Sequence, residues 1–470
     1  MDRKTKIIAT LGPASADAAT IRALVAAGMD VARLNFSHGE HDDHRRFAER
    51  VREAARAEGR SVALLQDIQG PKIRVGGFPG GAVELAEGSE VTLLQGPGDG
   101  DAETLYVDYE HLLEDIQPGE EVLLADGLIR LRVTASEGDA LRAEVLTGGR
   151  LGSGKGVAFP QSELRAPSVT DKDRRDLRFG RELGVDLVAA SFVRSAADVA
   201  QVAELAGGDT PVVAKIELAV AYERLEEILA EAQGVMVARG DLGVQLPLQK
   251  IPLVQVDILA RTNAAGRMSI TATEMLESMT VNPRPTRAEV TDVASAILTG
   301  TDAVMLSGET ASGKYPVRAV EMLDVICREI EGSLGYGSVQ EGLLRHEEPF
   351  PSATAKSAVD AARLLGVDTI VAFTESGSTA RLLSKYRPQA RIVAFTPEAR
   401  TYRQAAMLWG VRPLMFERLE STDAMIAFAA RRLLELGICE AGEGVVMVAG
   451  VPPNERHSTN LMKLHRLGND

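Results

Sequence analysis

The chain alternates short apolar runs with longer amphipathic segments, and this rhythm predicts parallel strands separated by helices. The apolar runs lie at 6–11, 30–36, 63–68, 186–193, 212–216, 234–238, 269–273 and 303–306. Helical patterns separate most of them, at 17–27, 42–58, 173–183, 196–205 and 221–231. Eight such units predict a (β/α)₈ TIM barrel, and an open doubly wound sheet is the alternative on this rhythm alone.

A β-rich segment interrupts the rhythm after the third run. Stretches such as AVELAEGSEVTLL alternate apolar and polar residues with the period of strands. We predict an all-β lid at residues 71–164, inserted in a βα loop between barrel parts at 1–70 and 165–345. Barrel active sites lie on the face that carries these loops, so the lid is placed to cover one.

A third segment follows residues 332–351, a stretch rich in Gly, Ser, Glu and Pro that is interpreted as a linker. Apolar runs at 369–373, 391–395 and 444–448 alternate with helical patterns at 353–365, 379–386 and 422–436. This pattern predicts a C-terminal α/β domain of the doubly wound type at residues 350–470. Three domains are expected, as suits a chain of 470 residues.

The net charge of −15 argues against a nucleic acid or an anionic membrane as partner of the whole protein. Small anionic substrates remain compatible, because a local cluster of cations outweighs a distant acidic surface. Only Cys327 and Cys439 are present, too few for a disulfide framework, and no Cys/His grouping indicates zinc. The N-terminal sequence lacks the apolar core of a signal peptide, and no run of 18 apolar residues predicts a membrane span, so a cytoplasmic location is expected.

Polar side chains recur where the predicted barrel strands end. They are Arg33, Asn35, Ser37, Asp67, Ser191, Lys215, Glu217, Arg239, Asp241, Thr273, Glu274, Ser307 and Glu309. One such residue is usually a helix cap or a solvated loop residue, but the repetition predicts a ring of cations, carboxylates and hydroxyls on one face. Fixed cations, with paired carboxylates that share one Mg²⁺, suit phosphoryl transfer, whose barrier falls mainly through positioning and charge neutralisation.

The segment GRLGSGKG at residues 149–156 nearly matches a phosphate-binding P-loop. Gly156 occupies the position that requires Ser or Thr, and the segment lies in the β-rich lid without a strand-to-helix context. It is interpreted as a flexible turn.

Eight sequence blocks carry a resemblance to one family. They are KIIATLGPAS, DVARLNFSHG, QDIQGPKIRVG, AKIEL, GVMVARGDLGVQLP, TATEMLESM, NPRPTRAEVTDVA and MLSGETASGKYP. In this order they resemble the signature blocks of pyruvate kinases, and the similarity continues to GVPPNERHSTNLMKLHRLG. The resemblance implies a barrel A domain, an inserted B lid and a C-terminal α/β domain. It also implies phosphoryl transfer from phosphoenolpyruvate to ADP, giving pyruvate and ATP, by an allosteric homotetramer.

The resemblance assigns roles to individual residues. Glu217 and Asp241 would ligate Mg²⁺ or Mn²⁺, and Lys215 would stabilise the transferring phosphoryl group. Arg33 and Arg74 would bind phosphate, and the backbone N–H groups of Gly240 and Asp241 would bind the substrate carboxylate. Thr273 would lie beside the enolate carbon, with Ser307 and Glu309 in a relay that protonates it. Asp126 would reach the site when the lid closes. The alternatives are a buried ion-pair role for Lys215 and a strand-end role for Thr273.

Many members of the family bind K⁺ through positions that match Asn35, Ser37, Asp67 and the carbonyl of Ile68. Here GPKIR replaces the familiar GPEIR, so Lys72 stands where K⁺-dependent members have Glu. An ammonium near this site supplies the missing positive charge, and we predict that K⁺ is dispensable. The alternative is a Lys72 that is merely exposed at the lid hinge.

The loop TESGSTAR at residues 374–381 resembles the family's effector-phosphate loop. Its candidate ligand residues are Thr374, Ser376, Gly377, Ser378 and Thr379, before a predicted helix N-terminus that favours phosphate. Glu375 adds negative charge, so a sugar monophosphate or AMP is expected as activator rather than fructose 1,6-bisphosphate. An ordinary Ser/Thr helix cap is the alternative.

Two other functions compete with the kinase. A Mg²⁺-enolate aldolase or lyase on the same barrel would use the two carboxylates but has no need of Arg33, Arg74 and a lid. A non-catalytic metabolite sensor would use the loop at 374–379, and the presence of Lys215, Glu217 and Asp241 speaks against it.

Overall fold

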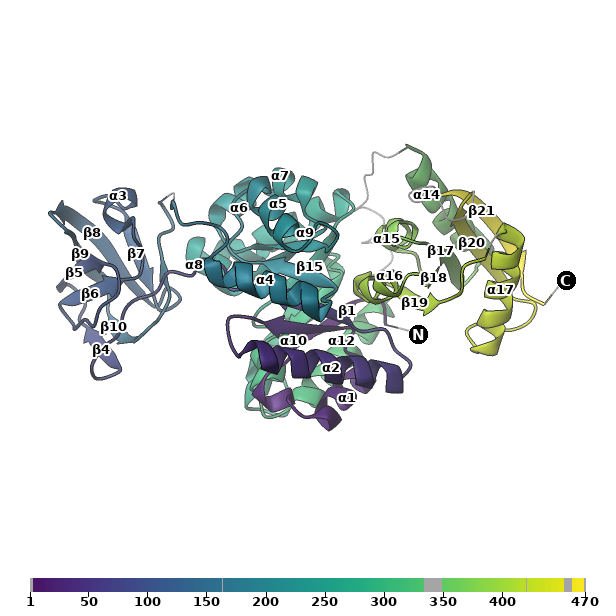
Figure 1. The fold of residues 1–470 in the computed structure, drawn as a ribbon, viewed down its shortest axis with the longest axis horizontal. Helices are drawn as coiled ribbons and strands as arrows, with labels where there is room; N and C mark the ends of the chain where they lie inside the picture. Colours follow the sequence, from purple (N-terminus) through teal and green to yellow (C-terminus); the bar gives the residue numbers. More distant parts are fainter. Residues whose placement is uncertain (1–2, 163, 334–348, 420, 452–458, 469–470) are drawn as a thin grey trace.

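The computed structural model describes residues 3–162, 164–333, 349–419, 421–451 and 459–468. Three bodies follow one another along the longest axis of the molecule: a β-rich body at one end, a barrel in the middle and an α/β body at the other end (Figure 1). The chain leaves the barrel after its third strand, builds the β-rich body and then returns to complete the barrel. This is the three-part architecture that the sequence predicts.

Eight parallel strands close the barrel in the order β1-β16-β15-β14-β13-β12-β3-β2. They are β1 (Lys6–Thr10), β2 (Val31–Asn35), β3 (Ala63–Asp67), β12 (Leu187–Ala190), β13 (Val212–Ile216), β14 (Gly234–Ala238), β15 (Met268–Ala272) and β16 (Ala303–Leu306). Because the sheet is closed, the (β/α)₈ prediction is confirmed and the open doubly wound alternative is wrong.

Helices surround these strands. They are α1 (Ala18–Ala27), α2 (His41–Ala57), α4 (Asp171–Leu183), α5 (Ala196–Leu205), α6 (Ala219–Glu223), α7 (Leu225–Glu231), α8 (Arg239–Gln245), α9 (Ile251–Ala264), α10 (Arg287–Leu298), α11 (Gly308–Ala311) and α12 (Pro316–Glu331). Side-chain caps fix several starts: Thr170 accepts from the backbone N–H of Asp173 at α4, and Thr286 accepts from that of Glu289 at α10.

One glycine lets α4 approach the barrel. A Cβ at Gly180 would lie 1.9 Å from Gln66 Oε1 of β3, whose amide donates to the carbonyl of Asp176 at 2.7 Å. A larger residue would displace the Gln66 amide and break its bond to α4. The helix that follows the lid is thereby held against the strand that precedes it.

The inserted body has its own core and two sheets. A six-stranded sheet runs β11-β7-β8-β9-β5-β6, and β10 pairs with β4. The strands are β4 (Ala82–Leu85), β5 (Glu90–Gln95), β6 (Thr104–Val107), β7 (Glu121–Leu124), β8 (Ile129–Glu137), β9 (Ala140–Thr147), β10 (Gly149–Gly152) and β11 (Val157–Ala158). The one-turn helix α3 (Leu112–Asp115) was not predicted. Residues 149–152 of the P-loop-like segment form strand β10, so its interpretation as a flexible turn is wrong there. A turn follows at 153–154, and the segment leads into β11 rather than into a helix.

The C-terminal body is a five-stranded sheet in the order β19-β18-β17-β20-β21. Its elements are α14 (Pro349–Leu365), β17 (Thr369–Phe373), α15 (Ser378–Lys385), β18 (Arg391–Thr396), α16 (Ala399–Gln404), β19 (Val411–Met415), α17 (Thr422–Glu435), β20 (Gly444–Gly450) and β21 (Thr459–Arg466). Helices α14 and α15 share one core with the sheet and α17 shares another, as expected of a doubly wound domain. Most of the predicted linker lies outside the described residues.

Buried ion pairs join this C-terminal domain to the amino-terminal end of the barrel. Asp302, just before β16, binds Lys385 and lies 2.8 Å from an Arg387 nitrogen; all three side chains are almost fully buried. Asp186, just before β12, lies 2.7 Å from both Arg52 and Arg403. These contacts reach the barrel from the end opposite to its βα loops.

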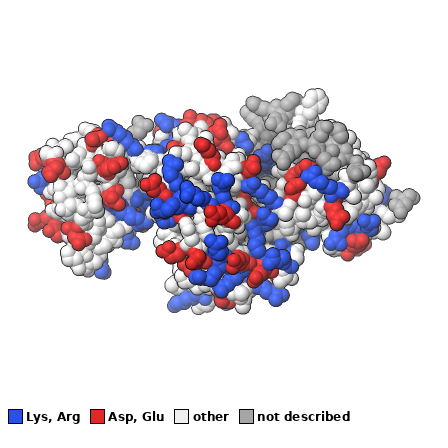
Figure 2. Space-filling model, viewed as in Figure 1, with Lys and Arg blue, Asp and Glu red and all other residues white. Residues whose placement is uncertain are grey.

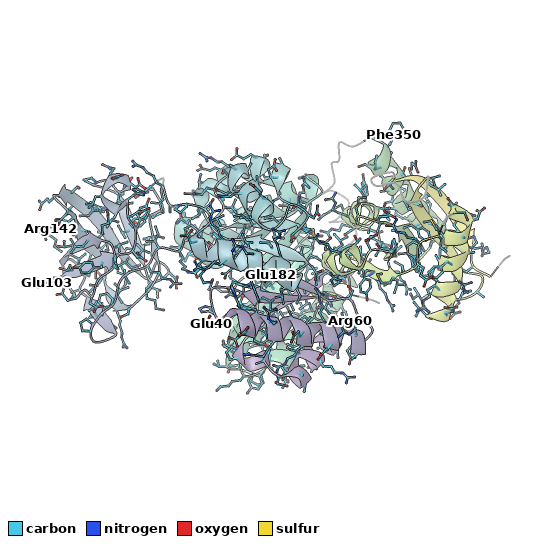
Figure 3. All side chains as sticks on the ribbon, viewed as in Figure 1. Glu40, Arg60, Glu103, Arg142, Glu182 and Phe350 are labelled. Atoms are coloured by element: carbon cyan, nitrogen blue, oxygen red, sulfur yellow. The ribbon has the colours of Figure 1, made fainter. Side chains whose placement is uncertain are left out.

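A cavity of about 740 Å³ lies at the same junction, lined by Arg3, Lys4, Lys6, Arg60, Arg391 and Arg412 among others. Figure 3 places Arg60 at the end of α2 on the side of the C-terminal domain. Burial lowers the pKa of Lys4 and of Lys6 to about 8. On the face drawn in Figure 2, acidic and basic side chains are interspersed over all three domains.

None of the helices in the described ranges combines the length and apolar character needed to cross a bilayer.

Candidate active site

Arg33 and Asp67 form a buried ion pair at the carboxyl ends of β2 and β3. Arg33 Nε donates to Asp67 Oδ2 at 2.7 Å, and a second guanidinium nitrogen donates to Thr10 Oγ1 at 3.0 Å. Burial alone would raise the pKa of Asp67, but Arg33 and Lys215 outweigh it and hold that pKa below its usual value. Asp67 is therefore an ionised carboxylate in a closed setting, and Arg33 is held at the barrel mouth.

The ammonium group of Lys215 has three acceptors around it. Its Nζ lies 2.7 Å from Ser191 Oγ, 2.8 Å from Glu217 Oε1 and 3.3 Å from Asp67 Oδ1. Burial favours a lower pKa of Lys215, but Asp67 and Glu217 raise it above its usual value. Lys215 is thus a fixed positive charge and also the ion-pair partner that the alternative interpretation described; its catalytic role stays a prediction.

Glu217 is a buried carboxylate with a second carboxylate, Asp241, nearby. The backbone N–H of Phe192 donates to Glu217 Oε2 at 2.7 Å. Burial raises the pKa of Glu217, Lys215 opposes this rise, and the negative charge of Asp241 adds to it. No group of three or more His, Cys, Asp or Glu side chains suited to a metal occurs among the described residues. Two carboxylates that repel each other fit a Mg²⁺ whose other ligands are water and substrate oxygens.

Thr273 and Glu274, after β15, hold a left-handed backbone with φ of +65° and +54°. For a β-branched residue this conformation is a true outlier, and such strain costs about 1–3 kcal/mol. The Thr273 hydroxyl donates to the carbonyl of Ala272 at 2.6 Å and accepts from the backbone N–H of Gly240 at 3.0 Å. Arg239 donates to the carbonyls of Ala272 and Thr273, so its guanidinium holds the strained corner.

A cleft of about 450 Å³ separates the lid from the barrel mouth. Lys72, Asp126 and Gly156 line it from the lid side, and Glu217 and Asp241 line it from the barrel. Lys72 Nζ lies 3.6 Å from Asp241 Oδ1 across it. The cleft gives the carboxylate pair access to solvent and to a substrate.

Two predicted lid residues have defined places. Asp126 has a left-handed backbone with φ of +58° at the tip between β7 and β8. Arg74 pairs with Gly156 as an isolated bridge, and its guanidinium donates to the carbonyl of Gly154 at 2.9 Å. Arg74 is therefore held at the root of the lid, near the barrel rather than on the outer sheet.

Glu309 is fully engaged with backbone. Its two oxygens accept from Leu276 N at 3.0 Å and from Ser307 N at 2.7 Å, and the residue is 1% exposed. It thereby ties the start of α11 to the loop after β15. This arrangement gives Glu309 a capping contact; the protonation relay with Ser307 stays a prediction.

The predicted K⁺ residues lie together, but Lys72 does not contact them. Asn35 and Asp67 are register partners on β2 and β3, and Asn35 Oδ1 accepts from Ser37 N at 3.2 Å. The carbonyl of Ile68 accepts from Ser191 Oγ at 2.7 Å. The ammonium that reaches this group is that of Lys215 at Asp67, whereas Lys72 lies at Asp241.

The predicted effector loop forms the start of α15. Gly377 caps the helix with φ of +83°, its N–H donates to Thr374 Oγ1 at 2.9 Å, and Ser376 Oγ donates to Ser378 Oγ at 3.2 Å. Thr379, by contrast, is buried with its hydroxyl 2.8 Å from that of Thr459, so its side chain does not face a ligand.

The negative charge of Glu375 has a partner. The carboxylate lies 3.2 Å from an Arg418 nitrogen, and the Glu375 carbonyl accepts from Thr401 Oγ1 at 2.6 Å. The expected repulsion of a doubly phosphorylated sugar is therefore weaker than the sequence alone indicates.

Sequence reasoning missed three contributions to the site. Ser191 was noticed as a polar strand end, but its contact with Lys215 was not expected, and neither was the left-handed Phe192 next to it (φ of +54°). Gly156 was interpreted as a turn residue only, although a Cβ there would lie 3.2 Å from Lys72 Cε. A polar residue at a strand end was the signal for Ser191; for a backbone conformation such as that of Phe192 the sequence carries no signal.

Two family models match the chain. The one described as pyruvate kinase, barrel domain, matches residues 2–320, and the one described as pyruvate kinase, alpha/beta domain, matches residues 352–465. A pyruvate kinase of Mycobacterium tuberculosis is 44% identical over 476 residues, which cover 100% of both chains. Those of Staphylococcus saprophyticus and Geobacillus stearothermophilus are both 43% identical, covering 100% and 99% of this chain and 81% and 80% of the relatives. The chain belongs to the pyruvate kinase family.

Proposed function

We propose that the protein is a glycolytic pyruvate kinase, which transfers the phosphoryl group of phosphoenolpyruvate to ADP and yields pyruvate and ATP. One observation carries the proposal: a positively charged Lys215 lies between Asp67 and Glu217 at the barrel mouth, with Asp241 beside Glu217 on the barrel side of the lid cleft. Mg²⁺ or Mn²⁺ held by Glu217 and Asp241 would neutralise charge on the transferring group. Lys215 supplies a second, fixed positive charge at the same point.

The other residues have supporting roles in this proposal. Arg33 and Arg74 bind phosphate oxygens, and the N–H groups of Gly240 and Asp241 bind the substrate carboxylate. Thr273 lies beside the enolate carbon, where pyruvate is formed by proton addition. Ser307, with Glu309 holding its backbone, and Asp126 on the lid complete the predicted set.

A coupled assay tests the function. Purified protein, phosphoenolpyruvate, ADP and MgCl₂ are combined with lactate dehydrogenase and NADH, and pyruvate formation is followed as loss of NADH. Turnover that depends on both substrates supports the kinase. Pyruvate release without ADP would mean that phosphoenolpyruvate is hydrolysed, with water as the phosphoryl acceptor, and a lyase or a sensor would give no turnover of these substrates; either result rejects the proposal.

Independence from K⁺ is a separate part of the proposal. Lys72 places an ammonium on the barrel-facing side of the lid, at Asp241 rather than at the residues predicted to bind K⁺, and would supply the positive charge to the site from there. We expect kcat to stay within about twofold when tetramethylammonium replaces K⁺ and Na⁺, because the protein supplies that charge itself. A collapse of turnover in that buffer contradicts it, and the matched variant Lys72→Glu is expected to become K⁺-dependent.

A sugar monophosphate or AMP is the proposed activator at residues 374–379. The supporting features are two hydroxyls, Ser376 and Ser378, and a glycine-capped helix start of the kind that binds phosphate. Calorimetric titration of the full chain with AMP, ribose 5-phosphate and glucose 6-phosphate tests this. A Ser376→Ala/Ser378→Ala double variant that binds as tightly as the parent contradicts the assignment.

A cytoplasmic homotetramer is the proposed assembly, with domain boundaries at 71, 164 and 350. Two exposed apolar groups support two kinds of subunit contact. One, just before and at the start of α9, contains Leu248, Leu253 and Val256; the other is spread over α14, with Phe350 at its start and Leu364 near its end, and β21, with Leu464. Phe350 projects away from its domain in Figure 3 and is 80% exposed. Light scattering that gives the mass of a single chain rejects the tetramer.

A further inference from the structure

Ser191 and Phe192 form a corner at the carboxyl end of β12 that contacts both charged residues of the proposed phosphoryl site. Ser191 is 4% exposed, and its hydroxyl lies 2.7 Å from Lys215 Nζ. The next residue, Phe192, has φ of +54° and donates its backbone N–H to Glu217 Oε2 at 2.7 Å. Two consecutive residues therefore hold Lys215 and Glu217, one through a side chain and one through the backbone.

The Ser191 hydroxyl has a fixed direction. Its oxygen lies 2.7 Å from the Ile68 carbonyl and 3.4 Å from Asp67 Oδ1, and its single hydrogen is best used at the nearer acceptor. A lone pair then faces the Lys215 ammonium, whose other two contacts are both carboxylates. Ser191 is the one neutral acceptor among the three, and it offers no charge that would draw Lys215 away from a substrate.

The left-handed backbone of Phe192 sets the direction of its N–H. At φ of +54° the peptide turns back towards β13, where Glu217 accepts it. Gly70, itself at φ of +67°, makes room for the ring, since a Cβ there would lie 3.0 Å from Phe192 Cδ2. A residue that prefers the extended region would turn this N–H away from Glu217.

We propose that the Ser191–Phe192 corner is a positioning device for phosphoryl transfer, in which Ser191 orients the Lys215 ammonium and the left-handed Phe192 backbone orients the Glu217 carboxylate. The inference rests on the proposed function, because it concerns the two groups that the function assigns to phosphate and metal. A long lysine side chain reaches its productive position only when a neighbour fixes it, and such supporting contacts typically change activity or metal affinity about 10–100-fold.

The first test removes the Ser191 hydroxyl. In Ser191→Ala we expect kcat to fall about 10–100-fold while KM for phosphoenolpyruvate changes less than about threefold, because Lys215 acts mainly on the transferring group. Ser191→Thr restores the hydroxyl and should bring kcat back to within about fivefold of the parent. An Ala variant with parental kcat, or a Thr variant as slow as Ala, overturns the role of Ser191.

A matched control separates positioning from packing. Ser384, in the C-terminal domain, is also a buried serine that donates to a backbone carbonyl, that of Trp409 at 2.7 Å. Ser384→Ala should lower the melting temperature about as much as Ser191→Ala but leave kcat within about twofold. Equal losses of kcat in both variants would show that Ser191 acts through folding alone.

The second test compares two variants of Phe192 that both lack the aromatic ring but differ in their preference for a left-handed backbone. Asn tolerates positive φ and the β-branched Val does not. Titration calorimetry with MnCl₂ alone should give a dissociation constant raised about tenfold or more in Phe192→Val and less than about threefold in Phe192→Asn. Equal affinities in the two variants overturn the role of the left-handed backbone, even if one of them is inactive.

The activity of the parent protein distinguishes failure of the proposed function from failure of the positioning role. If the parent does not transfer phosphate from phosphoenolpyruvate to ADP, the proposed function fails. If the parent is active and the Ser191 and Phe192 variants match it in kcat and in Mn²⁺ affinity, only the positioning role fails.

Discussion

The two ends of the barrel both hold buried charges, but in opposite imbalance. At the βα-loop end, Arg33 and Lys215 face Asp67, Glu217 and Asp241, and the pKa of Glu217 is raised by burial and by its acidic neighbour. At the other end Asp302 faces two cations. Burial lowers the pKa of Lys385 there to about 8, against the opposing pull of Asp302.

The excess of carboxylates at the loop end suits the binding of a cation. The charges at the other end are already paired, because the C-terminal domain covers them. Six non-glycine residues with positive φ occur in the described ranges. Five lie in the lid tip or at barrel strand ends (Ala125, Asp126, Phe192, Thr273 and Glu274), and Arg387 lies at the docking end. Strain of this kind persists where surrounding structure enforces it and is concentrated at functional sites. The loop end of the barrel is thus built for chemistry and the other end for stability.

The largest expected effect is at Lys215. Lys215→Met removes the fixed positive charge beside Glu217, and kcat should fall by about 10³-fold, because a preorganised charge acts on the transition state. The coupled assay measures this. Lys155→Met is the control, an exposed lid lysine of the P-loop-like turn, and should keep kcat within about twofold. Equal losses would mean that the turn takes part in catalysis.

The next effect is on stability at the docking end. Asp302→Ala leaves Lys385 and Arg387 buried without their carboxylate, which should destabilise the protein by roughly 3–5 kcal/mol, with kcat at 25 °C within about threefold. Urea unfolding followed by circular dichroism measures the loss. Asp360→Ala, which breaks the exposed contact with Lys356, should cost less than about 1 kcal/mol. A large drop in kcat for Asp302→Ala would contradict the conclusion that this end of the barrel serves stability and not chemistry.

The same pair predicts a pH dependence. Burial alone would raise the pKa of Asp302, but Arg387 and Lys385 hold it below its unfolded value. Its contribution to stability is therefore present above about pH 4 and lost as the pH falls through the lower, folded value. Melting temperatures of parent and Asp302→Ala should differ most at pH 6–7 and converge towards pH 3. A constant difference over this range would mean that the pair is not ionised in the native state.

The smallest effect concerns strain. Thr273→Ser keeps the hydroxyl and removes the β-branch at φ of +65°, so the free energy of unfolding should rise by about 1 kcal/mol. The kcat should fall a few-fold, because the side chain at residue 273 is less firmly held. Thr271→Ser, the same change inside β15, should instead destabilise by about 1 kcal/mol, since a buried methyl is lost without relief of strain. Differential scanning calorimetry of both variants decides whether the backbone at 273 stores energy.

The sequence predicted the parts of this molecule that follow from periodicity. Buried parallel strands such as 212–216 and 234–238 appear at the predicted residues because continuous apolar runs leave little choice of register. β19 was missed because it contains Pro413 and Arg412, which an edge strand tolerates and a central one does not. The edge strand β21 was missed for a related reason, since polar residues such as Asn460, Lys463 and Arg466 interrupt its apolar ones.

Within the site, residue types could be predicted and contacts could not. Strand-end position was enough to nominate Lys215, Glu217 and Asp241. The location of Lys72 at Asp241 rather than at Asp67 depends on how the lid leaves the barrel, and this path is set by tertiary packing. Backbone strain at Phe192 is likewise a product of the surrounding fold, because Phe has no intrinsic preference for positive φ.

The path of the chain into and out of the lid has a mechanical consequence. It departs after β3 and returns before α4, which leads into β12, and β3 and β12 are adjacent in the barrel. Two tethers that leave the rim at one place define a single axis, so a rotation of the lid would carry the outer sheet along an arc about that axis. Lys72 and Arg74 lie on a tether and would stay near the barrel at any angle, whereas β5 and β6, remote from the barrel in Figure 1, would travel furthest.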